Sequence, residues 1–307
     1  MLLLLTQSHG RQSLQPTTSR ATFTAHLRLT MASTLLLRPP RGLDAASLSP
    51  LLLFCGGFFL PRSFYSSYLH MITQYFPTAQ LVFIQDASTL SQEIPVLEAS
   101  EVVVNQLKNC PKQIPVILMG HSRGGAVAAL SAMREPSRVT AVVLLDPVDD
   151  NSMTLWNSLS TRRCEGNPLP PFFIVSTPYG GRSSYYKKAI FTSACAPEGR
   201  NADAIWNAFR SCEQNVGLLV KFPELGHFQL FHTDISESSS FANICATNDR
   251  LSYDRISSYK ILLFGMVFRF LQLMERDALD SGLESLVSKE MASSTQFVEL
   301  NVEWEKT

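Results

Sequence analysis

The feature that most constrains this chain is a serine between two glycines, in the run Gly120-His121-Ser122-Arg123-Gly124. The apolar run 114–119 precedes it and the small-residue segment 126–133 follows it. Strand, G-x-S-x-G and helix in this order predict a sharp turn that exposes the serine as a nucleophile. Glycines two residues away on either side avoid the clashes that side chains would make in such a turn. We therefore expect a serine nucleophile at Ser122, the alternative being a glycine-rich turn that happens to contain serine.

The rest of the chain alternates between short apolar runs and amphipathic segments. Strands are expected at 51–55, 81–84, 114–119, 139–145, 172–175 and 217–220. Helices are expected at 64–76, at 91–109 with Ser91 as its N-cap, after the serine turn, around 205–209 and at 259–274. Strands that alternate with helices predict an α/β fold, with a mostly parallel central sheet covered by helices on both faces.

Composition excludes several classes of function. The 26 basic and 26 acidic residues balance, so we expect no nucleic-acid partner. No apolar stretch reaches the roughly 18 residues of a membrane-spanning helix. The six cysteines are widely spread, with no C-x-x-C and no H-E-x-x-H, so we expect no metal. Buried free thiols are the favoured interpretation of the cysteines, with a Cys195–Cys212 bridge as the alternative.

Both ends of the chain differ from the middle. The first 43 residues contain no Asp or Glu, carry scattered arginines and are rich in Ser and Thr. These properties are typical of an organelle transit peptide, although an untargeted disordered start or translation from Met31 would read similarly. We therefore predict a disordered plastid transit peptide at 1–45, a folded domain at 46–276 and an acidic C-terminal tail at 277–307.

A serine nucleophile needs a base, which is nearly always histidine. Four of the six histidines are unsuited by position. His9 and His26 lie in the presequence, and His70 lies on a helix before the serine turn. His121 is next to the serine, and its side chain is expected to point away. His227 follows Gly226 in the loop directly after the strand, taken here as 217–222, at the sheet edge where the serine turn opens. His232 lies five residues further on. His227 is therefore the predicted base.

The acid that orients this base is expected between the serine and the histidine in the chain. The loop 176–182 contains no carboxylate, whereas Asp146 ends the preceding strand at the edge where catalytic groups gather. Asp149 and Asp150 are the fallbacks in the same loop. The alternative for Asp146 is a loop-capping residue ahead of Pro147.

The oxyanion of an acyl-transfer reaction needs two backbone donors. The N–H of Arg123 is one candidate, and a second is expected from the loop after the first strand, where we choose Phe58. Gly57, Phe59 and Phe228 are predicted to contact substrate. Aromatic residues are frequent near these loops, although each could instead belong to the core: Phe58, Phe59, Phe64, Tyr179, Tyr185, Tyr186, Phe228 and Phe231.

The chain resembles the chlorophyllases. The resemblance is carried, in the family's order over roughly residues 50 to 275, by four segments: Gly120-His-Ser-Arg-Gly-Gly125, Leu145-Asp-Pro-Val148, Cys195-Ala-Pro-Glu-Gly-Arg-Asn201 and Gly226-His227. Where the family has His-Gly in the oxyanion loop, this chain has Gly56-Gly57.

The resemblance implies an α/β-hydrolase fold, no metal or organic cofactor, and hydrolysis of the phytyl ester of chlorophyll or a related pigment. Location in the chloroplast is predicted from the N-terminal segment. It places the catalytic serine, aspartate and histidine at Ser122, Asp146 and His227. Peripheral contact with a thylakoid or envelope membrane is compatible with such a substrate, and the oligomeric state stays open. The alternatives are a lipase-like esterase or thioesterase for another long-chain ester, and an inactive pigment or lipid carrier.

Overall fold

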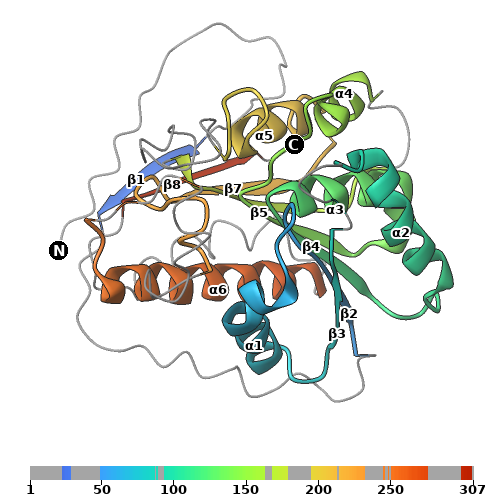
Figure 1. Ribbon diagram of the computed structural model, residues 1–307, viewed down its shortest axis with the longest axis horizontal. Helices are drawn as coiled ribbons and strands as arrows, with labels where there is room; N and C mark the ends of the chain where they lie inside the picture. Colours follow the sequence, from blue (N-terminus) through green and yellow to red (C-terminus); the bar gives the residue numbers. More distant parts are fainter. Residues whose placement is uncertain are drawn as a thin grey trace, which may run out of the picture.

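The computed structural model describes residues 23–28, 49–86, 88, 93–162, 168–178, 195–212, 214–231, 245, 248, 250–275 and 299–305. Its middle layer is an eight-stranded sheet with the strand order β1-β8-β7-β6-β5-β4-β2-β3 (Figure 1). Six neighbouring strands are parallel: β2 (Leu51–Cys55), β3 (Gln80–Ile84), β4 (Val116–His121), β5 (Ala141–Leu145), β6 (Phe172–Ser176) and β7 (Gly217–Lys221). The predicted strand positions and the mostly parallel sheet are thereby confirmed.

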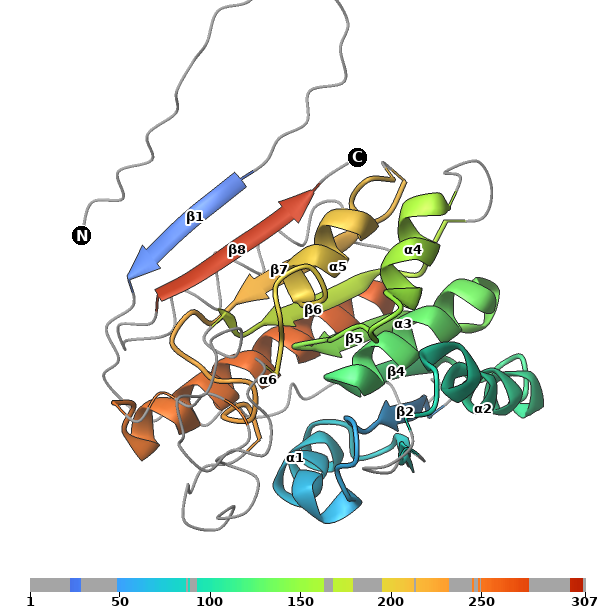
Figure 2. The same ribbon diagram turned by 45° about the horizontal axis from the view of Figure 1, so that its top comes forward.

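Helices cover both faces of the sheet, as predicted (Figures 1 and 2). One face carries α1 (Ser66–Tyr75), which continues the 3-10 turn Arg62–Tyr65, and the long α6 (Tyr253–Glu275). The other face carries four helices: α2 (Val96–Asn109), α3 (Arg123–Arg134), α4 (Thr154–Thr161) and α5 (Ala202–Phe209). A second 3-10 turn, Pro136–Arg138, links α3 to β5.

The sheet separates two hydrophobic cores. Alternate residues of a strand point to opposite faces, so Leu52 and Phe54 of β2 join the core under α1 and α6. Leu53 and Cys55 of the same strand join the core under α2 to α5. Both faces of the parallel strands are therefore buried, which explains why they read as continuous apolar runs in the sequence.

Some helix boundaries differ from the prediction. α2 begins at Val96 with Pro95 as its N-cap, so Ser91, which lies outside the described residues, is not the N-cap. Pro95 favours this start of α2 because its ring fixes φ at about −65°, which suits the extended N-cap residue, and because it has no N–H that would need a partner. α6 begins at Tyr253, six residues before the predicted start at Tyr259, and α4 was not predicted.

Two strands come from segments that were predicted to lie outside the folded domain. β8 (Glu299–Glu305) pairs antiparallel with β7, and β1 (Phe23–Arg28) pairs antiparallel with β8. Backbone pairing at a sheet edge needs no strong apolar pattern, which is why these strands were missed. Disorder throughout 1–45 is therefore wrong for β1, and the acidic tail contributes β8. The targeting role of the N-terminal segment stays a prediction.

The structure contains a disulfide between Cys195 and Cys245. The expectation of free thiols is wrong for these two residues, and the alternative Cys195–Cys212 bridge is wrong as well, because Cys212 is a buried free thiol. The two bonded cysteines are 50 residues apart, in segments that become neighbours only after folding. Among the helices of the described residues, none combines the length and hydropathy that crossing a membrane requires.

Candidate active site

Ser122 occupies the turn between β4 and α3, with φ 54° and ψ −130°. A positive φ is rare for a residue with a side chain and indicates a strained backbone held by its surroundings. A Cβ atom on Gly120 would lie 2.3 Å from the carbonyl oxygen of Gly124, and one on Gly124 would lie 2.3 Å from the oxygens of Cys55 and Gly56. The two glycines of the motif are therefore required by backbone contacts, and the turn has the predicted elbow geometry.

Asp146 and His227 form a hydrogen-bonded pair. Oδ2 of Asp146 lies 2.6 Å from Nδ1 of His227, and both side chains are almost fully buried. Asp146 directly follows β5 and has a φ of 45°, and its Oδ1 accepts the backbone N–H of Thr177 at 2.8 Å. The Thr177 hydroxyl also donates to Oδ2. Thr177 therefore fixes the carboxylate that faces the histidine, a contact that the sequence analysis missed.

The pair lies close to Ser122. β4, β5 and β7 are parallel, so the residues that follow them share one edge of the sheet. The ring centroids of His227 and His121 are 4.7 Å apart, and His121 directly precedes the serine. The backbone N–H of Ser122 also donates to the carbonyl of Leu145, the residue before Asp146, at 3.1 Å. The serine turn therefore lies beside the loop of Asp146, whereas His232 lies outside the described residues.

Asp149 and Asp150, the two fallback acids, bind backbone N–H groups instead of a histidine. The carboxylate of Asp149 accepts the N–H groups of Asp150, Leu155 and Trp156. Burial is the main cause that raises the pKa of Asp149, and these three hydrogen bonds oppose it. Asp150 accepts N–H groups at the start of both α2 and α4, from Val96 at 3.2 Å and Thr154 at 3.0 Å. Both carboxylates therefore hold helix ends in place.

The two predicted oxyanion donors come from neighbouring segments. Arg123 is the first residue of α3, where a backbone N–H has no partner within its own helix. The loop with Phe58 follows β2, whose end packs against Gly124 as described above. Gly57 in this loop donates its own N–H to the Tyr65 hydroxyl at 2.7 Å, so it is not free to bind an oxyanion. Phe58 and Arg123 remain the candidates.

The side chain of His121 does not point away from the site, contrary to expectation. It is fully buried between His227 and the Tyr65 hydroxyl, which lies 2.9 Å from its Nδ1. Burial raises the pKa of Tyr65, so the phenol keeps its proton and can donate it to this nitrogen. His121 ends a strand, and its side chain projects to the α1 face, where the Tyr65 ring supports it.

The predicted aromatic residues divide into two groups. Phe64, Phe228 and Phe231 are buried and pack against one another or against His121, as core residues do. Phe59 is 39% exposed, and Phe58 beside it is partly buried. Phe59 is thus the predicted substrate contact that remains accessible. Tyr179, Tyr185 and Tyr186 lie outside the described residues.

No group of three or more His, Cys, Asp or Glu side chains within the described ranges is arranged to hold a metal ion.

A serine at a strained strand-to-helix elbow, beside an Asp–His pair on a parallel sheet, defines the α/β-hydrolase class. The sequence profile of the chlorophyllase family matches residues 14–301. The chain therefore belongs to the chlorophyllase family, a family of ester hydrolases within that class.

Comparison with solved structures returns other hydrolases at low similarity. Acyl-protein thioesterase 2 from Zea mays is 13% identical with a TM-score of 0.39, covering 72% of this chain and 96% of its own. A putative YdeN-like hydrolase from Pectobacterium atrosepticum is 16% identical with a TM-score of 0.38, covering 70% and 92%. Est1E from Butyrivibrio proteoclasticus is 14% identical with a TM-score of 0.38, covering 61% and 83%. No curated protein sequence matches the chain significantly.

Proposed function

We propose that this protein hydrolyses the phytyl ester of chlorophyll, or of a closely related pigment, to the chlorophyllide acid and phytol. The observation that carries the proposal is membership of the chlorophyllase family over nearly the whole chain. The buried Asp146–His227 pair beside the Ser122 elbow supplies the groups that ester hydrolysis requires.

In the first half of the reaction, His227 takes the proton of the Ser122 hydroxyl as the oxygen attacks the ester carbonyl. The backbone N–H groups of Phe58 and Arg123 stabilise the oxyanion that forms. The bond between the former carbonyl carbon and the phytyloxy oxygen then breaks, and His227 gives its proton to this departing alkoxide, so that phytol leaves and the acyl group stays on Ser122. Asp146 keeps Nδ1 of His227 protonated and stabilises the imidazolium between these steps.

In the second half, water attacks the acyl–serine ester and gives its proton to His227. Collapse of this second intermediate breaks the bond to Ser122, whose oxygen recovers the proton. The products are the pigment's free carboxylic acid and the regenerated serine. No oxidant, reductant or cofactor enters this balance.

Substrate affinity in this proposal comes from the apolar tail. Burying ten of its carbons would contribute about 8 kcal/mol at about 0.8 kcal/mol each, before the cost of ordering. Exposed ion pairs contribute about 0–1 kcal/mol. Phe59, which is 39% exposed beside the loop of the proposed oxyanion donor, is suited to contact such a tail.

The decisive experiment compares two substrates on the purified full-length chain. We expect chlorophyllide to form from chlorophyll a, measured by phase separation of the acid from the phytylated pigment. A p-nitrophenyl ester of similar chain length, assayed in parallel, reports general esterase activity. Efficient cleavage of the simple ester without any chlorophyllide would favour the alternative, a lipase-like esterase or thioesterase. Activity on neither ester would favour the carrier hypothesis.

We also propose import into a plastid, because residues 1–43 lack Asp and Glu but contain arginines and many hydroxyl side chains. A fluorescent protein fused behind residues 1–50 is expected to accumulate in plastids of transfected leaf cells. Changing the arginines of this segment to glutamate should abolish import and serves as the control. A fusion that stays in the cytosol would contradict the proposal.

A further inference from the structure

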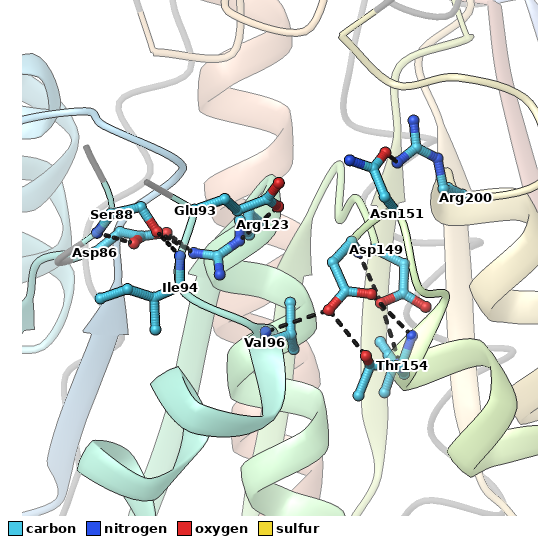
Figure 3. A network of polar contacts seen from close by, with 12 residues as sticks. Asp86, Ser88, Glu93, Ile94, Val96, Arg123, Asp149, Asn151, Thr154 and Arg200 are labelled. Atoms are coloured by element: carbon cyan, nitrogen blue, oxygen red, sulfur yellow. Dashed lines mark hydrogen bonds and ion pairs between the residues drawn. The ribbon is translucent and has the colours of Figure 1, made fainter. Parts of the chain in front are cut away.

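Arg123, the residue after Ser122, carries a buried guanidinium that the proposed reaction does not use. Its side chain is only 5% exposed, and Nη1 donates to Oδ2 of Asp86 and to Oγ of Ser88 at 3.1 Å (Figure 3). Nε lies 3.5 Å from Oε1 of Glu93, whose side chain is 41% exposed. The innermost partner of the guanidinium is therefore the carboxylate of Asp86.

Asp86 is fixed by its own segment. It follows β3, the strand at the edge of the sheet beside β2, and its side chain is 3% exposed. Its Oδ1 accepts the backbone N–H of Ser88 at 2.7 Å, and Oγ of Ser88 in turn accepts the N–H of Ile94 at 3.0 Å. The Asp86 carboxylate is thus oriented by contacts within its own segment, independently of Arg123. A buried arginine side chain that binds such a fixed acceptor has little conformational freedom.

Arg123 is connected to both halves of the proposed oxyanion site, through its own backbone and through its side chain. The backbone N–H of Arg123 is itself one donor, at the start of α3. Cζ of the same residue lies 6.0 Å from the centroid of the Phe58 ring, within the range of a cation–π contact, and Phe58 supplies the other donor. A single anchored side chain therefore links the two peptide groups that would bind the oxyanion.

We propose that Asp86 is a positioning residue, whose ion pair with Arg123 holds the N–H groups of Arg123 and Phe58 in the geometry that binds the oxyanion. Oxyanion stabilisation depends on donors fixed in advance, and small misplacements lower the rate steeply. This inference rests on the proposed attack by Ser122 on an ester, but it does not depend on chlorophyll being that ester.

The test uses Asp86→Asn in the full-length chain, with p-nitrophenyl butyrate and chlorophyll a as substrates. A fluorophosphonate titration counts the functional sites, so that kcat is expressed per reactive serine. An alkyl trifluoromethyl ketone, which forms a tetrahedral oxyanion adduct with a catalytic serine, probes the oxyanion site directly. Arg123→Lys is the second variant, because it keeps the charge and the backbone N–H but loses the planar donor fork.

We expect Asp86→Asn to lower kcat per titrated site by about 10- to 100-fold, below the roughly 10²- to 10³-fold loss of a whole donor. KM should change less than about twofold, and inhibition by the ketone should weaken by the same factor as kcat/KM. Arg123→Lys should act in the same direction. The double variant should be no worse than the more damaged single variant, because both changes break one interaction.

Glu101→Gln provides the matched control. Glu101 binds Arg134 at the other end of α3, with Nη2 and Oε1 2.6 Å apart, so this variant breaks an ion pair on the same helix far from the serine. It should leave kcat and ketone inhibition unchanged.

Two results would overturn the inference: unchanged kcat per titrated site in both test variants, or a loss of kcat without a parallel loss of ketone affinity. If Asp86→Asn does not fold, Arg123→Lys alone decides between these outcomes. Wild-type cleavage of the butyrate without chlorophyllide formation would remove the proposed substrate and leave the role of Asp86 standing.

Discussion

Replacing Ser122 with alanine is expected to abolish ester hydrolysis while the protein stays folded. Removing the nucleophile of a comparable serine hydrolase lowers kcat by about 10⁶-fold. Alanine has the same Cβ as serine, so the strained φ of 54° should cost the backbone no more than it does now. The measurements are kcat on chlorophyll a and on a p-nitrophenyl ester, fluorophosphonate labelling followed by peptide mapping, and thermal unfolding.

Ser131→Ala is the matched control for this prediction. Ser131 lies on α3, nine residues after Ser122, is fully buried and donates its hydroxyl to the carbonyl of Val127 at 2.7 Å. The Ser131→Ala variant should still be labelled by the fluorophosphonate and should keep its activity. Activity near that of the wild type in a folded Ser122→Ala protein would show that Ser122 is not the nucleophile.

Replacing Asp146 with asparagine is expected to lower kcat by about 10⁴-fold, the loss seen when the aspartate of a serine protease triad is changed in this way. The asparagine side chain can present an amide N–H to Nδ1 of His227, which would hold the wrong tautomer for a base. Asparagine also tolerates the positive φ of 45° at this position, so the main effect should be on chemistry. The loss should appear in kcat, with thermal unfolding little changed.

Asp149→Asn tests the choice of acid. Its carboxylate accepts three backbone N–H groups and, among the described residues, has no hydrogen bond to a histidine, so the variant should lose stability, by about 1 kcal/mol, rather than most of its activity. The comparison requires kcat and the midpoint of urea unfolding for both variants. Equal losses of kcat in Asp146→Asn and Asp149→Asn would refute the assignment of Asp146.

The parts of the site that the sequence predicted are those governed by local geometry. Gly120 and Gly124 are needed by backbone contacts within a few residues of Ser122 or on the adjoining loop, so their spacing reveals the turn. Asp146 and His227 could be proposed because each follows a strand, and parallel strands end at one edge. The six parallel strands were predictable for the related reason that strands buried on both faces are apolar throughout.

The contacts that the sequence did not reveal join residues far apart in the chain. Thr177, the residue after β6, binds Asp146, and Tyr65, the last residue of the 3-10 turn before α1, binds His121. Neither residue carries a local signal, because threonine and tyrosine are common in every environment. The partner of Cys195 was unpredictable for the same reason, since six cysteines allow many pairings and only the folded chain selects one.

The Cys195–Cys245 bond lies between the two segments that support the acid and the base. On one side, the carbonyl of Arg200 accepts the N–H of Asp149 at 2.9 Å, so the segment after Cys195 is attached to the loop of Asp146. On the other side, Asn248 exchanges hydrogen bonds with Gln229, which also binds Gly226 beside His227.

The disulfide thus joins the segment hydrogen-bonded to the loop of Asp146 to the segment hydrogen-bonded to the loop of His227. The disulfide is therefore one of the connections that hold the Asp146 carboxylate and the His227 imidazole in their relative positions. We therefore expect preparations of the protein that differ in the oxidation of Cys195 and Cys245 to differ in the placement of Asp146 relative to His227.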